Sequence, residues 1–78
     1  MTTMNDKISK KIGIKIKLLR TKLKMSQEEL GFKAGLNKNS IGGIERGENV
    51  PSIDTLNQIA NALEISLVEL VDVTKINL

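Results

Sequence analysis

The sequence contains no cysteine, histidine, tryptophan or tyrosine, and only one phenylalanine. Without cysteine and histidine it has no disulfide framework, no zinc finger and no ordinary thiolate or imidazole metal site, so we expect neither metal nor cofactor. One aromatic residue cannot build the platforms on which many nucleic-acid-binding folds stack bases. Because a phosphate-binding loop is also missing, we do not expect an enzyme.

Long apolar runs are missing too. No stretch approaches the ~20 residues that span a bilayer, and the first residues lack the apolar segment and cleavage site of a signal peptide. We therefore expect a cytoplasmic protein with no membrane partner. The 78 residues make one small domain, in which a core of Ile, Leu, Val, Met and Ala gives only ~3–5 kcal/mol of stability. Association with another subunit is the remaining way to stabilise a domain of this size.

The net charge of +3 is distributed unevenly along the chain. Residues 1–46 hold eleven Lys and Arg against four Asp and Glu, a net charge of +7. Residues 47–78 hold one Lys against five acidic residues, a net charge of −4. Charge alone leaves two interpretations evenly balanced: lysines that solvate a helix, or a surface that binds a polyanion.

The stretch from Met25 to Gly47, MSQEELGFKAGLNKNSIGGIERG, predicts two short helices joined by a tight turn. Ser26 followed three residues later by Glu29 is a capping box, so we expect a helix to begin at Ser26. Gly35 can end this helix, because glycine adopts the left-handed conformation at little cost.

The second helix of this stretch can be capped by Asn37. Its isoleucines, Ile41 and Ile44, are expected to face inward. The residues expected to face outward are Lys38, Asn39, Ser40 and Gly43. A helix-turn-helix over about residues 26–46 results, whose second helix fits the major groove of DNA. Since the motif lies in the basic half of the chain, the positive charge is now better interpreted as a surface that binds DNA.

Four strings, SQEEL, AGL, SIGGIERG and PSIDTLNQIANALEISLVEL, resemble the Cro/C1-type helix-turn-helix family over roughly residues 8–71. This family comprises phage repressors, small transcriptional regulators and restriction-modification controller proteins. The resemblance implies an all-α, five-helix, lambda-repressor-like domain with the helix-turn-helix at its second and third helices. It also implies a salt bridge between Arg20 and Glu45; the alternative is two exposed charges that contribute little.

The first helix is expected over residues 8–23, after a flexible terminus at residues 1–7. Apolar residues recur there at helical spacings of three and four; they are Ile8, Ile12, Ile16, Leu19 and Leu23. The basic side of this helix is interpreted as a solvated surface, with a role at a membrane surface as the alternative.

The second half of the chain predicts two more helices. Ser52 can cap a fourth helix that ends near Leu63. Its expected inward residues are Ile53, Leu56, Ile59, Ala60 and Leu63. Ser66 with Glu69 repeats the capping box for a fifth helix, and residues 72–78 form a C-terminal tail.

The expected DNA contacts depend on where each residue lies in the motif. Gln27 is in the first turn of its helix, where free N–H groups and the positive helix end favour a phosphate oxygen. Lys38 can donate to guanine O6 and N7, and Asn39 can bind adenine N6 and N7. Arg46 is expected to hold a phosphate. The full set of expected DNA-binding residues is Ser26, Gln27, Asn37, Lys38, Asn39, Ser40, Gly43 and Arg46.

The chain departs from the family pattern at several positions. Gly42 and Gly43 leave a frequent reader position of the second motif helix without a side chain, and either a close approach to DNA or simple tolerance explains this equally well. Local stability is in doubt at four further positions, which are Lys24, Gly31, Phe32 and Glu64.

The C-terminal segment carries more apolar surface than a short helix can bury. Either the tail, up to Leu78, is loose, or the surface pairs two copies of the chain. Pairing is favoured because a small module needs two half-sites for useful specificity. The predicted dimer surface consists of Leu67, Val68, Val71 and Ile76.

These observations together predict a single-domain, sequence-specific transcriptional regulator. It would act as a homodimer on a pseudo-palindromic operator in double-stranded DNA, as a repressor or a restriction-modification controller. The alternative is a protein-interaction regulator, antitoxin-like or of the sporulation type, in which DNA binding is secondary. No small-molecule ligand is expected.

Overall fold

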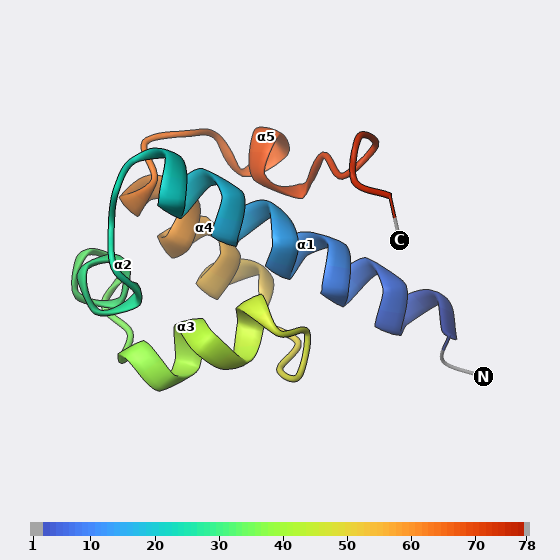
Figure 1. Ribbon diagram of the computed structural model, residues 1–78, viewed down its shortest axis with the longest axis horizontal. Coiled ribbons are helices and arrows are strands. Elements are labelled where there is room, and N and C mark those ends of the chain that lie inside the picture. Colours follow the sequence, from blue (N-terminus) through green and yellow to red (C-terminus); the bar gives the residue numbers. More distant parts are fainter. Residues whose placement is uncertain (1–2, 78) are drawn as a thin grey trace.

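The computed structural model describes residues 3–77, with side chains from residue 8 onward, as five helices joined by short turns. The helices are α1 (Thr3–Lys22), α2 (Gln27–Ala34), α3 (Lys38–Glu45), α4 (Ile53–Ala62) and α5 (Leu67–Val71). The long α1 crosses the molecule with α3 on one side and α5 on the other (Figure 1). The all-α, five-helix expectation is confirmed, and the described residues contain no strand.

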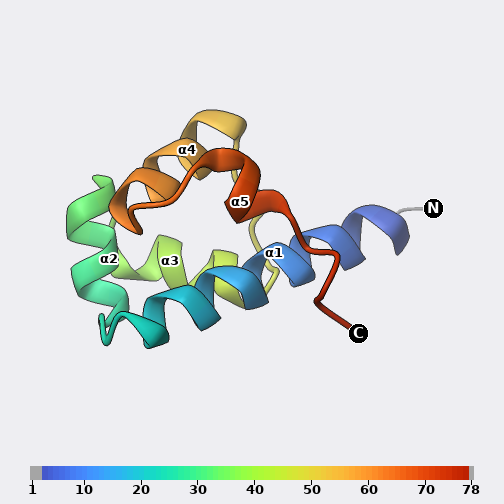
Figure 2. The ribbon, with the colours of Figure 1, turned by 90° about the horizontal axis from the view of Figure 1, so that it is seen from above.

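One core joins all five helices. Its largest fully buried side chains are Ile16, Leu30, Ile41, Ile59 and Leu70, one from each helix in order. Seen from above, α5 lies between α1 and α4 (Figure 2) and packs against both. Burying one large aliphatic side chain stabilises a fold by about 1.5–3 kcal/mol, so removing any of the five would loosen a whole helix.

The first helix begins earlier than expected, at Thr3 instead of Ile8. Met1 and Thr2 lie outside the described residues, and residues 3–7 of the expected flexible terminus belong to α1. Of the five apolar residues that recur along this helix, Ile8 and Leu23 are 47% and 49% exposed and lie outside the core. The N-terminal end of α1 extends past the other helices (Figure 1).

Three helix starts agree with the sequence. Ser26 accepts a hydrogen bond from the Glu29 N–H at 2.9 Å, and its own N–H donates to the Glu29 carboxylate at 2.9 Å. Asn37 caps α3 through the Ser40 N–H at 2.8 Å. Ser52 caps α4 in the same manner. Each cap satisfies an N–H that the first helical turn leaves without a partner.

The fifth helix departs from its predicted cap. Ser66 accepts a hydrogen bond from the Glu69 N–H at 3.0 Å, but the Glu69 side chain does not complete the box. It pairs with Lys15 of α1 at 3.6 Å instead. Lys15 also donates to the Asp72 carbonyl at 2.7 Å, so one lysine ties the end of α5 to α1.

The tail after α5 makes ordered turns up to residue 77. The Asp72 carboxylate accepts hydrogen bonds from the Thr74 hydroxyl and N–H, and these hold the pKa of Asp72 below its usual range. The Ile76 N–H donates to the Val73 carbonyl at 3.0 Å. Leu78 lies outside the described residues.

The departures from the family pattern have local consequences. Lys24 and Glu64 follow α1 and α4 with φ values of 59° and 62°, a left-handed conformation that costs about 1–2 kcal/mol for a residue with a side chain. At Gly31, a Cβ would lie 2.6 Å from the Leu36 carbonyl oxygen, so the turn between α2 and α3 requires glycine there. Ile53, expected in the core, is 61% exposed at the first position of α4.

No helix within residues 3–77 combines the length and the apolar character needed to cross a membrane.

Candidate nucleic-acid interface

The two sides of α3 differ sharply in exposure. Ile41 and Ile44 are 0% and 4% exposed and hold the helix to the core. Lys38 and Asn39, at its N-terminal end, are exposed, and Ser40 is half-buried. The exposed end of α3 is therefore the end that carries the two proposed base readers.

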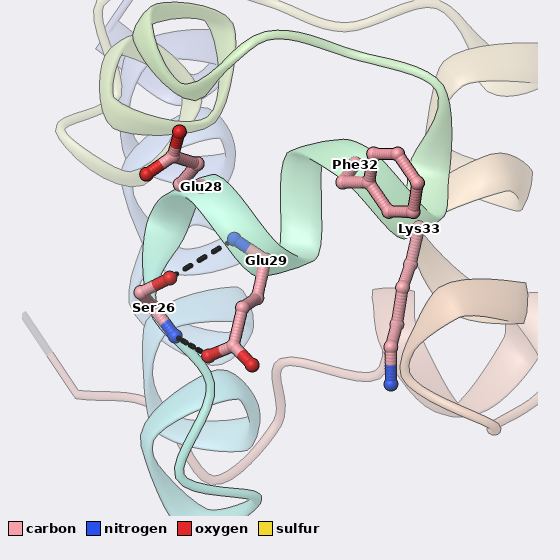
Figure 3. A pocket seen from close by; sticks show the side chains of 5 residues that line it. All are labelled: Ser26, Glu28, Glu29, Phe32 and Lys33. Atoms are coloured by element: carbon pink, nitrogen blue, oxygen red, sulfur yellow. Dashed lines mark hydrogen bonds between the residues drawn. The ribbon is translucent and has the colours of Figure 1, made fainter.

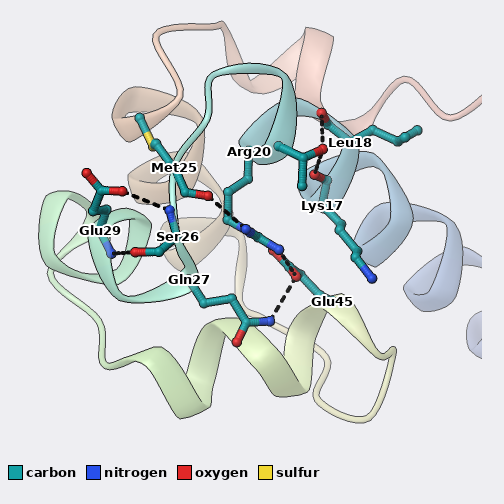
Figure 4. A network of polar contacts seen from close by, with 9 residues as sticks. Lys17, Leu18, Arg20, Met25, Ser26, Gln27, Glu29 and Glu45 are labelled. Carbon is teal, nitrogen blue, oxygen red and sulfur yellow. Dashed lines mark hydrogen bonds and ion pairs between the residues drawn. The ribbon is translucent and has the colours of Figure 1, made fainter.

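A buried ion pair sets the position of α3. Arg20 of α1 donates to both carboxylate oxygens of Glu45, at 2.6 and 3.0 Å (Figure 4). It also donates to the Met25 carbonyl at 2.8 Å. The side chains of Arg20 and Glu45 are 10% and 3% exposed, and the hydrogen bonds to Glu45 raise the pKa of Arg20. This is the pairing that the family resemblance implied.

Gln27 joins the two motif helices through the same carboxylate. Its amide nitrogen donates to Glu45 at 3.0 Å (Figure 4). A carboxamide nitrogen carries two hydrogens, so one remains for an external acceptor such as a phosphate oxygen. The Gln27 amide can thus hold the Glu45 carboxylate of α3 and donate to a bound ligand at the same time.

Close contact between α1 and α3 depends on Gly13, which sequence reasoning missed. A Cβ at this position would lie 2.6 Å from the Glu45 carbonyl oxygen and even closer to that of Ile44. The glycine therefore lets the backbones approach where Arg20 meets Glu45. The available signal was an isolated glycine inside a helical pattern, which often marks a packing contact.

Two of the expected DNA-binding residues serve as helix caps. The side-chain oxygens of Ser26 and Asn37 cap α2 and α3. Each keeps a donor, the hydroxyl or the amide nitrogen, that can face a phosphate. Their caps also orient the free N–H groups of both helix starts.

Arg46, directly after α3, is held by a neighbour on the surface. It donates to both carboxylate oxygens of Glu48, at 2.9 and 3.0 Å, and the two side chains are 61% and 60% exposed. This contact raises the pKa of Arg46 and lowers the pKa of Glu48. Because water reaches both groups, a DNA phosphate can replace the glutamate.

Gly43 was expected to face outward as a DNA contact, and it lies on the outward side of α3 but is not exposed. The residue is buried, because the side chain of Asn49 covers it. Gly42 is covered as well: a Cβ there would lie 3.1 Å from an Arg46 guanidinium nitrogen and 3.5 Å from the Gln27 amide oxygen. The glycines leave room for side chains from other elements.

A shallow pocket lies on the solvent side of α2 (Figure 3). Its volume is about 340 Å³, and it is lined by Ser26, Glu28, Glu29, Phe32 and Lys33. The Phe32 side chain is 86% exposed, the most of any large apolar residue among those described.

The predicted dimer residues separate into two groups. Leu67 is half-buried and packs against the core of its own chain, so it is not a free surface. Val68 and Val71 are 77% and 38% exposed. Ile76 is half-buried. A five-residue helix has one side toward the core, which Leu67 and Leu70 occupy, and this leaves the two valines outside.

Comparisons with known proteins agree with this architecture. A helix-turn-helix family model matches residues 16–70. The control protein C.BamHI of Bacillus amyloliquefaciens is 36% identical over 74 residues, which cover 94% of this chain and 91% of that protein.

Two solved structures are similar as well. The restriction-modification controller protein C.AhdI from Aeromonas hydrophila is 37% identical with a TM-score of 0.81, covering 83% of this chain and 94% of that one. The controller protein C.Esp1396I bound to a 25 base pair operator site is 33% identical with a TM-score of 0.74, covering 82% and 88%.

Proposed function

The chain belongs to the helix-turn-helix family, and we propose that it is a sequence-specific DNA-binding transcriptional regulator of the controller or repressor type. It acts by occupying an operator, where it blocks or recruits the transcription machinery. Its relatives include bacterial controller proteins, one of them solved on operator DNA. We infer that it is a regulator and not an enzyme, and that it works in the cytoplasm, where bacterial DNA lies.

The observation that carries this proposal is that α1 holds the C-terminal end of α3 on its buried side. The Arg20–Glu45 pair fixes the end of the helix, while its exposed N-terminal end presents Lys38 and Asn39. A rigid helix with free polar side chains at its N-terminal end is what base readout in the major groove requires. Lys38 matches guanine and Asn39 matches adenine.

Phosphate contacts complete the proposed surface. Arg46 follows α3 and is 61% exposed, and Gln27 keeps an amide hydrogen beside the first turn of α2. The positive N-terminal ends of α2 and α3 each favour an anion. These contacts set the register of the protein on the duplex, while the two readers choose the sequence.

Substitution of Asn39 and Arg46 tests the proposal. We expect Asn39→Ala to weaken binding to the preferred duplex by about 1–3 kcal/mol and to remove the preference at one base pair. Arg46→Ala should weaken specific and random duplexes alike and reduce the salt slope by about one unit. Fluorescence anisotropy at several salt concentrations measures both. Equal losses on both duplexes for Asn39→Ala would contradict its assignment as a reader.

We further propose that the functional unit is a homodimer formed through α5. Val68 and Val71 are exposed on a helix that lies across α1 from α3 (Figure 1), so DNA bound at α3 leaves them accessible. Pairing through them brings two recognition helices to one pseudo-palindromic site, about one helical turn or ~34 Å apart.

Sedimentation equilibrium tests the dimer. The unmodified protein should be a dimer at tens of micromolar, and the double variant Val68→Asp with Val71→Asp should be a folded monomer with much weaker operator binding. Gln58→Asp is the control, because Gln58 is exposed on α4 and the variant adds the same charge outside α5 and outside the proposed DNA surface. A wild-type monomer that still binds one operator tightly would refute the dimer.

One observation favours a second function, that of a protein-interaction regulator. The exposed Phe32 and its pocket form an apolar feature on α2 with no partner inside the described chain. If the wild-type protein selects no sequence from a random duplex library, the result would favour a protein-interaction regulator over a sequence-specific DNA-binding protein. Phe32→Ser would then remove the interaction without disturbing the core.

A further inference from the structure

The side chain that covers Gly43 has no role in the interface described above. We propose that Asn49 reads a DNA base in place of the side chain that α3 lacks at residue 43. This inference rests on the proposed function, because it assigns one more residue to the same DNA-binding surface. The matching base is adenine, whose N6 donor and N7 acceptor fit a carboxamide.

Position 43 lies at the centre of the outward side of α3. Asn39, Gly43 and Arg46 follow one another at spacings of four and three, so they share one face of the helix. Ile41 and Ile44 hold the opposite face in the core. A side chain at residue 43 would therefore emerge between the proposed reader Asn39 and the proposed phosphate contact Arg46.

Asn49 supplies a polar group at this place from the loop after α3. A Cβ added to Gly43 would collide with the Asn49 amide nitrogen and would lie 3.0 Å from its Cγ. Asn49 is nevertheless exposed. The side-chain hydrogen bonds of this loop join Arg46 to Glu48, and within the described chain the Asn49 amide takes no part in them. Its donor and its acceptor both remain for a ligand.

Backbone hydrogen bonds hold the loop in this position. The N–H groups of Glu48 and Asn49 both point to the Gly43 carbonyl, at 2.9 and 3.3 Å. The Gly47 N–H donates to the Ile44 carbonyl at 3.0 Å, and its φ of 75° turns the chain back along the helix. An amide that is placed before DNA arrives loses less conformational freedom on binding, which favours affinity.

Base selection by the full-length protein tests this inference. Duplexes selected from a random library give the base preference of the wild type at each position, and the variants are then compared with it. Asn49→Ala should lose the preference at one position of each half-site and weaken binding to the selected duplex about 5- to 150-fold. Binding to a scrambled duplex should change by less than about twofold, because phosphate contacts remain.

Two further variants and a control make the result specific. Gly43→Ala displaces the Asn49 amide and should lose the preference at the same base position. Asn49→Asp replaces the donor by a second acceptor, so the preference should move from adenine to cytosine, whose N4 donates. Asn57→Ala changes an exposed asparagine of α4 and should leave every preference in place. Thermal melts establish that each variant is folded.

The possible failures are distinguishable. If Asn49→Ala keeps every base preference, or weakens selected and scrambled duplexes equally, Asn49 only fills space or contacts phosphate, and this inference is wrong while the proposed function stands. If the wild type selects no sequence, the proposed function fails and this inference fails with it.

Discussion

Two arginine–glutamate pairs of this molecule have similar geometry and opposite surroundings. Arg20 holds the two oxygens of Glu45 at 2.6 and 3.0 Å, and Arg46 holds those of Glu48 at 2.9 and 3.0 Å. The side chains of the first pair are 10% and 3% exposed, whereas those of the second are 61% and 60% exposed. Water competes for the second pair far more than for the first.

The surroundings of an arginine–glutamate pair decide what the pair does in the molecule. The first pair joins residues that are 25 positions apart on two helices, so it fixes the tertiary position of α3. The second joins residues two positions apart in one loop, so it adds no link between elements. The sheltered pair therefore holds α3, the proposed reading helix, in place, while the exposed pair leaves Arg46 available for the proposed phosphate contact.

The largest effect is expected from breaking the sheltered pair. Arg20→Ala or Glu45→Ala leaves a buried charge without its partner, which should cost about 3–5 kcal/mol, comparable to the whole stability of a domain of this size. Urea denaturation followed by circular dichroism measures the loss. The milder variants Arg20→Lys and Glu45→Gln allow a double-mutant cycle, with an expected coupling above ~1 kcal/mol. Additive losses would mean that the two groups do not interact.

Separating the helices around the sheltered pair should have the next largest effect. The methyl group of Gly13→Ala would push on the backbone carbonyls of α3, at a cost of about 1–3 kcal/mol, or several degrees in Tm. Lys17→Ala is the control, since Lys17 is exposed on the same helix. A stabilised Gly13→Ala protein would contradict the close contact, because alanine is otherwise the better helix residue by about 0.5–1 kcal/mol.

Removal of the third donor to Glu45 should cost less. Gln27→Ala deletes a partly buried hydrogen bond to the carboxylate, which we expect to lower the free energy of unfolding by about 1 kcal/mol. Gln58→Ala, at an exposed position of α4, provides the matched control. If both variants melt at the wild-type temperature, the hydrogen bond from Gln27 to Glu45 adds nothing to the stability of the fold.

The smallest effect on stability is expected at the exposed pair. Alanine at Arg46, at Glu48 or at both should leave the thermal midpoint within experimental error. The lowered pKa of Glu48 would add stability only above the pKa of the unfolded chain, and this would be lost as the pH falls through the folded pKa. Because water surrounds both groups, we expect the acid unfolding curve of Glu48→Gln to match the wild type. A clear shift would mean that this pair also supports the fold.

Local signals predicted the helix starts because a cap involves only residues within three positions. Ser26, Asn37 and Ser52 cap their helices as the sequence indicated. The cap of α5 was only half right, since Lys15 from a distant helix competes for Glu69. Competition of this kind is invisible to a pattern read along one segment.

The buried side of α1 was harder to predict. Its apolar stripe includes Ile8 and Leu23, which are exposed, whereas Ser9 and Gly13 are buried. Apolar periodicity identifies a helix and its approximate face. It does not indicate that the neighbouring helix approaches so closely that only small residues fit between them.

Spacing along the chain was enough to predict that five helices form, where the helix-turn-helix lies and which residues cap α2, α3 and α4, because these features depend on hydrogen bonds between near neighbours. The packing of distant segments was needed to show that Arg20 and Glu45 are sheltered from water and that Asn49 occupies the space over Gly43. It was also needed to show that Leu67 packs inward while Val68 stays exposed. The physical reason is that burial and the filling of space by another element depend on segments distant in the chain, and no local pattern records which of them will meet.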